Sequence, residues 1–263
     1  MLTRRELRDA FQTLGLQNCP VIVHTSVKAF GGIEHGPPAL LGALLESVGA
    51  LMVPTFTYKT MVTPSVGPPN NALTYGGDRD ANRMAEIFHV NMPADPLMGV
   101  FAETVRRHPQ AQRSQHPILS FAGIQAGDYL AAQTLFDPLA PIGALGRDGG
   151  WVLLLGVDHT VNTSIHYAEK LAGRRQFVRW ALTCQRIVEC PGFPGCSLGF
   201  QAIFPAVQKI TRRLEIGKAH IQAIPLMPLF EIAQMMIREN PHALLCERQD
   251  CERCQAVRNT EPV

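Results

Sequence analysis

The chain has 263 residues, and its charges nearly cancel, because 24 Lys and Arg against 22 Asp and Glu leave a net charge of +2. Such a balance argues against non-specific electrostatic binding to nucleic acid or to an anionic membrane. Hydrophobic residues make up 46% of the chain and charged residues 17%, which excludes extensive disorder. We predict one large α/β domain over residues 1–263, with residues 240–263 as a cysteine-containing tail.

The sequence predicts a cytoplasmic protein with no membrane partner. No apolar run approaches the roughly 20 residues that a membrane-spanning helix needs. The amino terminus has a helix capping signal in place of the apolar core of a signal peptide. The seven cysteines are odd in number and scattered, which fits a reducing compartment better than a disulfide framework.

The first part of the chain predicts a strand–helix–strand unit. Thr3 and Glu6 have the spacing of a capping box, so a short helix follows and ends at Gly15. A nearly unbroken β-branched run over 21–27 predicts a buried strand. Pro37 opens a helix that ends before residue 49, and residues 50–57 predict the next strand.

The later elements extend this alternating pattern. Residues 58–79 carry many Pro, Gly and Asn and predict a long loop, and Asp95 caps a helix that continues to residue 107. The remaining predicted elements are strands at 118–124 and 151–157, helices at 125–135, after residue 163 through residues 171 and 173, and at 227–239, and β-rich segments at 177–189 and 213–224. The order predicts an α/β fold with a polar site where the strand at 151–157 meets the following helix.

Three common catalytic signatures are missing. No G-x-G-x-x-G follows a strand, no P-loop surrounds Gly217 and Lys218, and no G-x-S-x-G elbow is present. The dinucleotide-binding, P-loop and α/β-hydrolase interpretations are therefore set aside.

Six segments, in order, resemble the aminoglycoside 3-N-acetyltransferase (antibiotic N-acetyltransferase) family between about residues 21 and 173. They lie at 24–26, 51–57, 98–103, 113–121, 149–157 and 163–169. The resemblance implies a three-layer α/β/α sandwich around a largely parallel or mixed sheet, with a β-rich C-terminal part, unlike the GCN5-type acetyltransferase fold. It also implies acetyl-CoA as the donor and an aminoglycoside-type amine as the acceptor, hence an enzyme of antibiotic resistance.

His166 is the first candidate for the general base of acetyl transfer. A neutral imidazole accepts a proton near physiological pH, and Glu169 lies three residues later on the same helix face, where it can orient the ring. A pair with this spacing also occurs on solvated helix faces. His116, in a polar turn before a strand, is the second candidate, and its alternative is a turn histidine bonded to backbone. Because the motifs contain no cysteine, we expect direct transfer without an acetyl-enzyme.

The donor is expected at the end of the first predicted strand. Open α/β sheets bind ligands outside the carboxyl ends of their strands, and the resemblance assigns this turn to coenzyme A. The predicted donor-binding residues are His24, Thr25, Ser26, Lys28, Arg113 and Ser114. An aminoglycoside is polycationic, so Glu103 and Asp158 are the predicted acceptor contacts.

The cysteines raise a separate hypothesis. Cys246, Cys251 and Cys254 form C-x4-C-x2-C, and Cys196, beyond a Pro- and Gly-rich loop that begins at Cys190, supplies a fourth thiol for a structural zinc. Free surface thiols and core cysteines are the alternatives. Cys19 and Cys184 lie on apolar strands and are predicted to be core residues.

Three other functions stay open at this point. The acceptor of the same chemistry can be an unrelated metabolic amine. A metal-dependent hydrolase could be built from His24, His116, His166 and Glu169, although their spacing matches no zinc-protease signature. A nucleic-acid-binding module held together by zinc would depend on Arg248, Arg253 and Arg258.

Residues 177–263 can supply a homodimer surface or a lid.

Overall fold

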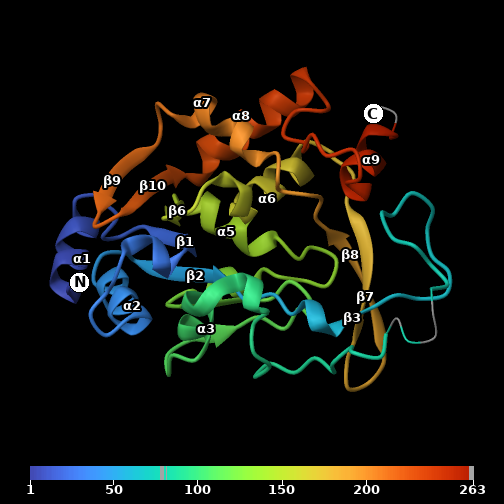
Figure 1. Ribbon diagram of the computed structural model, residues 1–263, viewed down its shortest axis with the longest axis horizontal. Helices are drawn as coiled ribbons and strands as arrows, with labels where there is room; N and C mark the ends of the chain where they lie inside the picture. The colour runs from blue at the N-terminus through green and yellow to red at the C-terminus, as the bar shows by residue number, and fades with distance from the viewer. Residues whose placement is uncertain (78–79, 81, 261–263) are drawn as a thin grey trace.

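A seven-stranded mixed sheet forms the centre of the computed structural model, which describes residues 1–77, 80 and 82–260 (Figure 1). The last two residues of the predicted loop at 58–79 and the last three of the tail lie outside this range. The strand order is β4-β5-β2-β1-β6-β10-β9. The strands are β1 (Pro20–Thr25), β2 (Ala50–Pro54), β4 (Gln112–Arg113), β5 (Phe121–Ile124), β6 (Trp151–Leu155), β9 (Arg212–Ile216) and β10 (Ala219–Pro225).

Only the middle of this sheet is parallel among the described strands. β1 pairs in parallel with β2 on one side and with β6 on the other, whereas β5, β4, β10 and β9 are added antiparallel. The chain runs from β1 to β2 on one side of β1, and it later returns as β6 on the other side, so the strand order reverses between β1 and β6. A crevice at the carboxyl ends of β2, β1 and β6 is the expected ligand site of such a sheet.

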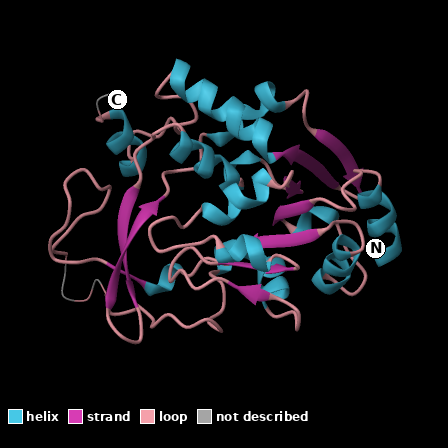
Figure 2. Ribbon diagram, turned by 180° about the vertical axis from the view of Figure 1, so that it is seen from behind, coloured by secondary structure: helices cyan, strands magenta, loops and turns pink. Residues whose placement is uncertain are grey.

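Helices cover both faces of the sheet and give the predicted three layers (Figures 1 and 2). One face carries α1 (Arg4–Gln12), α2 (Pro37–Leu45) and α3 (Gly99–Arg106); the other carries α4 (Gly127–Ala131), α5 (Ala140–Arg147), α6 (Thr163–Leu171) and α8 (Leu226–Glu239). Side chains alternate along β1, so Val21 and Val23 pack in the first apolar core and Ile22 in the second. His24 follows Ile22 onto the second face, at the strand's end.

The C-terminal part differs in one respect from the prediction of a β-rich region. β7 (Phe177–Leu182) and β8 (Ile187–Phe193) form a long hairpin that pairs with β3 (Met61–Val62) in a separate sheet, as Figure 1 shows. β9 and β10 instead complete the edge of the central sheet. The remaining short elements are α7 (Phe204–Val207), α9 (Glu252–Arg258) and the 3-10 turns η1 (Val27–Phe30), η2 (Tyr58–Thr60), η3 (Pro96–Met98), η4 (His159–Val161) and η5 (Phe200–Ile203).

The two predicted helix caps, at Thr3 and Asp95, are both present, but only the first starts the helix as predicted. The capping box is confirmed, because Thr3 Oγ1 accepts from the Glu6 N–H at 3.2 Å while Glu6 Oε2 accepts from the Thr3 N–H at 2.7 Å. Asp95 caps as predicted, but the helix it starts is interrupted at Gly99, whose φ of 80° separates η3 from α3.

Three described helices were not predicted: α5, the short α7 and the tail helix α9. The core prediction for two cysteines was wrong, since Cys184 is exposed and Cys19 is only half-buried. Within the described residues, no helix has the length and apolar character needed to cross a membrane.

Candidate active site

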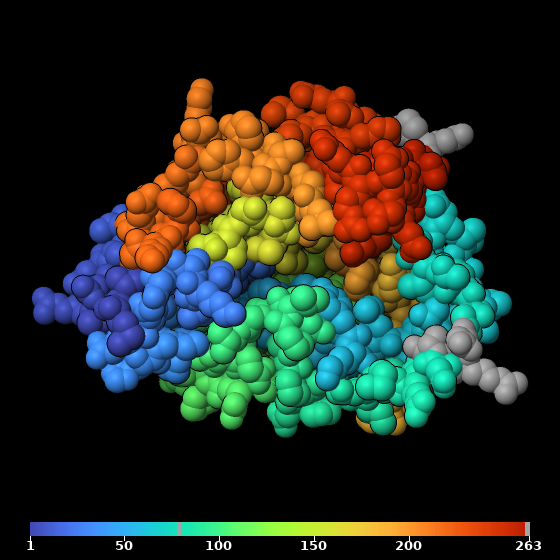
Figure 3. Space-filling model, viewed as in Figure 1, coloured from blue at the N-terminus to red at the C-terminus, as the bar shows by residue number. Residues whose placement is uncertain are grey.

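A cavity of about 590 Å³ opens at the carboxyl ends of β1, β2 and β6. Figure 3 shows the surface hollowed between the segment that includes α3 and the C-terminal segment. The cavity walls come from β1 and β2, from η3 and α3, from the start of α6, and from the loop after β8. The lining side chains include His24, Thr25, Phe56, Tyr58, Met98, Thr160, Thr163, His166, Cys196, Ser197, Leu198 and Arg253. This is the position that the reversal of strand order predicts.

The junction between β6 and α6 places His166 in this cavity. Gly156 turns the chain with a φ of 67°, and Asn162 caps α6 through its side-chain oxygen, which accepts from the Ser164 N–H at 3.1 Å. α6 then runs between the sheet and α8, so its polar first two turns are buried from Thr163 to Glu169. Thr163 and His166, three residues apart, share the face that lines the cavity.

Behind His166 lies a buried chain of charged groups. Its Nδ1 lies 2.7 Å from Glu169 Oε2, and Arg174 Nη1 donates to Glu169 Oε1 at 2.7 Å. The side chains of His166, Glu169 and Arg174 are 8%, 2% and 3% exposed. Arg174 Nη2 also donates to the carbonyls of Pro241 and Ala243, at 2.8 and 2.7 Å. Thus the guanidinium neutralises the carboxylate and anchors it to the segment after α8.

This geometry selects one tautomer of His166. A carboxylate accepts hydrogen bonds, so in the neutral ring Nδ1 carries the proton and Nε2 keeps its lone pair. Among the described residues no group bonds to Nε2, and the ring packs edge-on against Phe200 at 4.6 Å between ring centroids. His166 therefore lines the cavity with its ring orientation fixed by Glu169.

Sequence reasoning missed Arg174. It follows the turn at Gly173, whose φ of 76° reverses the chain after α6 and returns the arginine to the helix. The available signal was an arginine one residue after a helix-ending glycine and five residues after Glu169.

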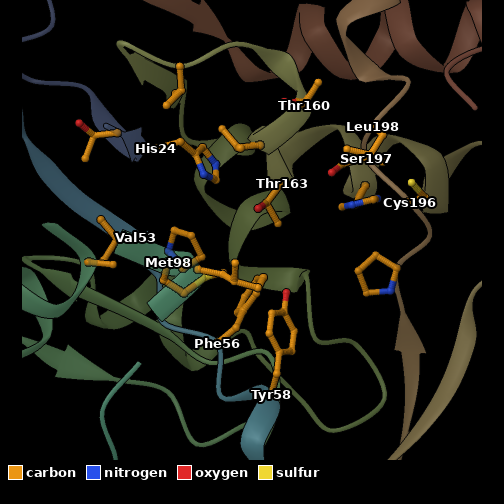
Figure 4. A pocket seen from close by; sticks show the side chains of 18 of the residues that line it. His24, Val53, Phe56, Tyr58, Met98, Thr160, Thr163, Cys196, Ser197 and Leu198 are labelled. Atoms are coloured by element: carbon orange, nitrogen blue, oxygen red, sulfur yellow. The ribbon is translucent and has the colours of Figure 1, made fainter. Parts of the chain in front are cut away.

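His24 and Thr25 reach the cavity from the end of β1, as predicted for donor-binding residues. Figure 4 shows His24 beside Thr163, facing the aromatic side chains of Phe56 and Tyr58. His24 Nε2 and Thr25 Oγ1 are buried and have no hydrogen-bond partner among the described residues. Burial lowers the pKa of His24 to about 3, so its ring is neutral. Both atoms are available to a bound polar group.

The wall opposite His24 was not predicted. Cys196, Ser197 and Leu198 lie there, in the loop after β8 (Figure 4). Arg253 of α9 completes it and donates from Nη1 to the Gly195 carbonyl at 2.9 Å. From below, Tyr58 contributes a phenol that stays protonated, because burial raises its pKa to about 12. No short motif connects these distant segments in the sequence.

His116 lies outside the described cavity lining, in the turn before β5. Its Nδ1 accepts from the N–H groups of Ile118 and Leu119 at 3.2 and 3.0 Å, so the alternative of a turn histidine bonded to backbone describes it. Burial lowers its pKa to about 4. Ser114 is likewise engaged, because its Oγ accepts from the Phe121 N–H at 2.8 Å. Neither residue is among those that line the cavity.

The other predicted ligand contacts also lie apart from the described lining. Glu103 pairs with Arg106 on α3 at 2.6 Å, and Asp158 caps η4 by accepting from the Thr160 N–H at 2.9 Å. Ser26 precedes η1 without a side-chain capping bond and donates from its N–H to the Leu155 carbonyl at 3.0 Å, and Lys28 is exposed. The carboxylates predicted to hold a polycation thus serve local structure.

Arg113 is a structural residue in this fold. Its Nε donates to Ser120 Oγ at 3.1 Å, Nη2 to the Thr55 carbonyl at 2.7 Å and Nη1 to the Val90 carbonyl at 2.9 Å. Burial lowers its pKa to about 10. All three nitrogens therefore donate to acceptors in the protein, and Arg113 is not among the residues that line the cavity.

We expect Arg113→Ala to lower the free energy of unfolding by about 3 kcal/mol, because buried acceptors lose hydrogen bonds to a charged donor. The KM for the acyl donor stays unchanged. Urea denaturation and donor titration measure both quantities, with Lys28→Ala as the exposed cation control, which should change stability by less than about 0.5 kcal/mol. A tenfold higher KM at unchanged stability would restore the phosphate-binding role.

Acid should destabilise the protein through its buried histidines. Burial lowers the pKa of His24, His116 and His159 to about 3, 4 and 4, from 6.5. Below pH 6.5 the unfolded chain binds protons that the folded chain does not, so stability is full above that pH and falls as the pH drops toward 4. Chemical denaturation between about pH 7 and pH 5 should show the free energy of unfolding falling as the pH falls. In His24→Gln the slope of this free energy against pH should be smaller by up to ~1.4 kcal/mol per pH unit. Exposed His220→Gln is the control, and an identical slope in both variants would contradict the assignment.

Of the two sets of candidate metal ligands, the cysteines lie close together and the histidines with Glu169 do not. Within the described residues, the grouping of His, Cys, Asp and Glu close enough to share an ion is that of Cys196, Cys246, Cys251 and Cys254. His24, His116, His166 and Glu169 form no such group there, so the hydrolase hypothesis loses its metal site. His166 Nδ1, in addition, is already bonded to Glu169.

Fold and site together define an α/β protein with a ligand-sized cavity at the switch point of a mixed sheet and a carboxylate-held histidine in its wall. The chain belongs to the aminoglycoside 3-N-acetyltransferase family, whose model matches residues 22–238. The resemblance seen in the sequence is therefore confirmed.

Two curated relatives illustrate the similarity. Aminoglycoside N(3)-acetyltransferase IX of Micromonospora chalcea is 34% identical over 186 residues, which cover 66% of this chain and 64% of that protein. The matched part is thus less than two thirds of that relative's length. Aminoglycoside N(3)-acetyltransferase III of Salmonella sp. is 26% identical over 292 residues, which cover 89% of this chain and 98% of that protein.

Solved structures confirm the α/β fold. The apoenzyme of aminoglycoside acetyltransferase AAC(3)-IVa has a TM-score of 0.78 at 25% identity, covering 98% of this chain and 97% of that one. A variant of AAC(3)-IVa in complex with a gentamicin has a TM-score of 0.79 at 23% identity over 98% of this chain and 96% of that one. AAC-IIIb in a binary complex with CoASH has a TM-score of 0.73 at 22% identity over 90% and 96%.

Proposed function

We propose that this chain is an acetyl-CoA-dependent N-acetyltransferase that acetylates an amine of an aminoglycoside-type antibiotic. The observation that carries the proposal is the buried His166–Glu169–Arg174 chain, with His166 lining a cavity at the strand ends. The family supports the reaction type. The AAC-IIIb complex with CoASH and the AAC(3)-IVa complex with a gentamicin support the two substrate classes.

His166 is the proposed general base of a direct transfer. As the amine nitrogen attacks the thioester carbonyl, Nε2 takes the proton that the nitrogen loses, and Glu169 stabilises the imidazolium that forms. When the tetrahedral adduct with its new N–C bond collapses, the C–S bond breaks. The coenzyme A thiolate leaves and recovers a proton from His166, so the base returns to its starting state.

The remaining cavity groups have roles that follow from their chemistry. His24 Nε2 and Thr25 Oγ1 lack internal partners among the described residues and are suited to the polar arm of the donor. The Tyr58 phenol is a hydroxyl donor that stays protonated, which suits a developing oxyanion. Arg253 adds a positive charge in the wall, where a phosphate of the donor would be attracted.

The presence of Arg253 in the cavity wall favours a second class of acceptor, a less cationic amine. Glu103 and Asp158 lie apart from the cavity lining, and Arg253 lies in it, so the described wall attracts a polycation less than the sequence predicted. A less cationic metabolic amine is the alternative acceptor.

Release of free thiol from acetyl-CoA tests the proposal and its alternative together. The purified chain is assayed with gentamicin, with apramycin and with a set of monoamines. Thiol release that requires an aminoglycoside supports the first acceptor, and release that requires only a monoamine supports the second. Donor hydrolysis at the same rate with and without any amine would overturn the transferase.

A further inference from the structure

Four thiols from three segments meet beside the cavity. Cys196 lies in the loop after β8, Cys246 follows α8, and Cys251 and Cys254 lie at the start of α9. Their sulfur atoms all lie within 4.8 Å of one another, and the Sγ atoms of Cys246 and Cys254 are 3.4 Å apart. Residues far apart in the sequence thus converge on one point.

The cluster is buried and stands apart from the two apolar cores. Cys196, Cys246 and Cys254 are 5%, 4% and 0% exposed, and the partly buried neighbours packed on them are Leu245 and Cys251. Thiols alone supply little apolar area to hold three segments together.

The backbone around the cluster is shaped to bring these segments together. At Gly199 a Cβ would lie 2.4 Å from the backbone of Leu245, so glycine permits the close approach of the two loops. Leu244 adopts a φ of 64°, which a leucine rarely does, just before Cys246. Strained or crowded backbone of this kind persists where its surroundings impose it.

We propose that these four cysteines bind a structural zinc ion. Tetrahedral Zn²⁺ with Zn–S bonds of about 2.3 Å places its sulfurs about 3.8 Å apart, which matches the observed cluster. The C-x2-C pair opening a helix is a common source of two such ligands. Zinc and four thiolates leave two negative charges. Arg253 and Arg258 lie beside them, bonded to the carbonyls of Gly195 and Cys246.

The ion would clamp the tail onto the cavity wall. Cys196 both lines the cavity and belongs to the cluster, and Arg253 lies between the ligands Cys251 and Cys254. Arg174 already holds the carbonyls of Pro241 and Ala243, so zinc extends this anchorage along the same segment. Metal binding also occupies the one described cavity-lining thiol, which removes it as an acetyl acceptor.

Metal analysis of the purified wild-type chain is the first test and needs no variant. We expect about one zinc ion per chain by elemental analysis, and X-ray absorption showing four sulfur ligands at about 2.3 Å. Iron at the site, disulfide-linked cysteines, or four thiols that alkylate freely in metal-free folded protein would each overturn the proposal.

Cys251→Ser and Cys184→Ser form a matched pair for the second test. Cys184 is exposed and outside the cluster, so its variant should retain full zinc content. Cys251→Ser should lose at least about tenfold in zinc affinity, and proteolysis should then cleave the 240–260 segment faster. Equal zinc content and equal cleavage in the two variants would contradict the assignment, whatever their activities.

Discussion

Replacing His166 with alanine should lower kcat for acetyl transfer by about 10²–10⁴-fold, the usual contribution of a positioned general base. The amine then has to lose its proton to water, although the cavity still holds both substrates. The KM for acetyl-CoA should change little, because the donor is assigned to the end of β1. Steady-state thiol release measures kcat and KM, and calorimetry measures donor binding.

His220→Ala is the control for this variant. His220 also pairs with a glutamate, Glu215 at 3.1 Å, but its side chain is 82% exposed on β10. It should retain wild-type kcat. If His166→Ala kept activity within about threefold of wild type while folded, His166 would not be the base.

Replacing Glu169 with alanine should cost about 3–5 kcal/mol of unfolding free energy. It leaves the Arg174 guanidinium, 3% exposed, without its carboxylate partner, and breaking a buried pair from one side is far costlier than breaking a surface pair. Glu103→Ala is the matched control, because Glu103 also pairs with an arginine but is 29% exposed, so about 1 kcal/mol or less is expected. Chemical denaturation measures both.

Two further variants separate the structural role of Glu169 from its positioning role. Glu169→Met combined with Arg174→Met removes both charges and should recover much of the stability while kcat stays low. Glu169→Gln keeps the shape, but its amide can donate to Nδ1 and favour the wrong tautomer, so kcat should fall by at least about 10²-fold. Full activity in Glu169→Gln would show that the carboxylate only stabilises the fold.

Much of the central fold could be predicted because hydrophobic period and helix signals are local. The βαβ unit at 20–54, the strand at 151–155 and the capping box at Thr3 depend on neighbouring residues alone. The His166–Glu169 contact was predictable for the same reason, since residues three apart share a helix face. α6 was harder to interpret as buried, because its first two turns are polar.

The parts that were not predicted depend on tertiary contacts. Arg174 reaches Glu169 only after a chain reversal, and Arg253 reaches the cavity from the other end of the sequence. His116 does lie in the turn that enters β5 next to the end of β2, yet its ring bonds to its own turn rather than facing the cavity. For Arg113, a cation near a polar turn gave no sign that three backbone carbonyls and Ser120 would take up its donors.

The most direct test of the central claim is a single-turnover experiment with acetyl-labelled acetyl-CoA and excess protein, followed by mass spectrometry of both protein and small molecules. With gentamicin present, we expect one acetyl group on an amine for each thiol released, and none on the protein. Without the amine, the label should stay on the donor. A labelled protein formed before the acetylated product, on Cys196 or elsewhere, would contradict direct transfer with His166 as base.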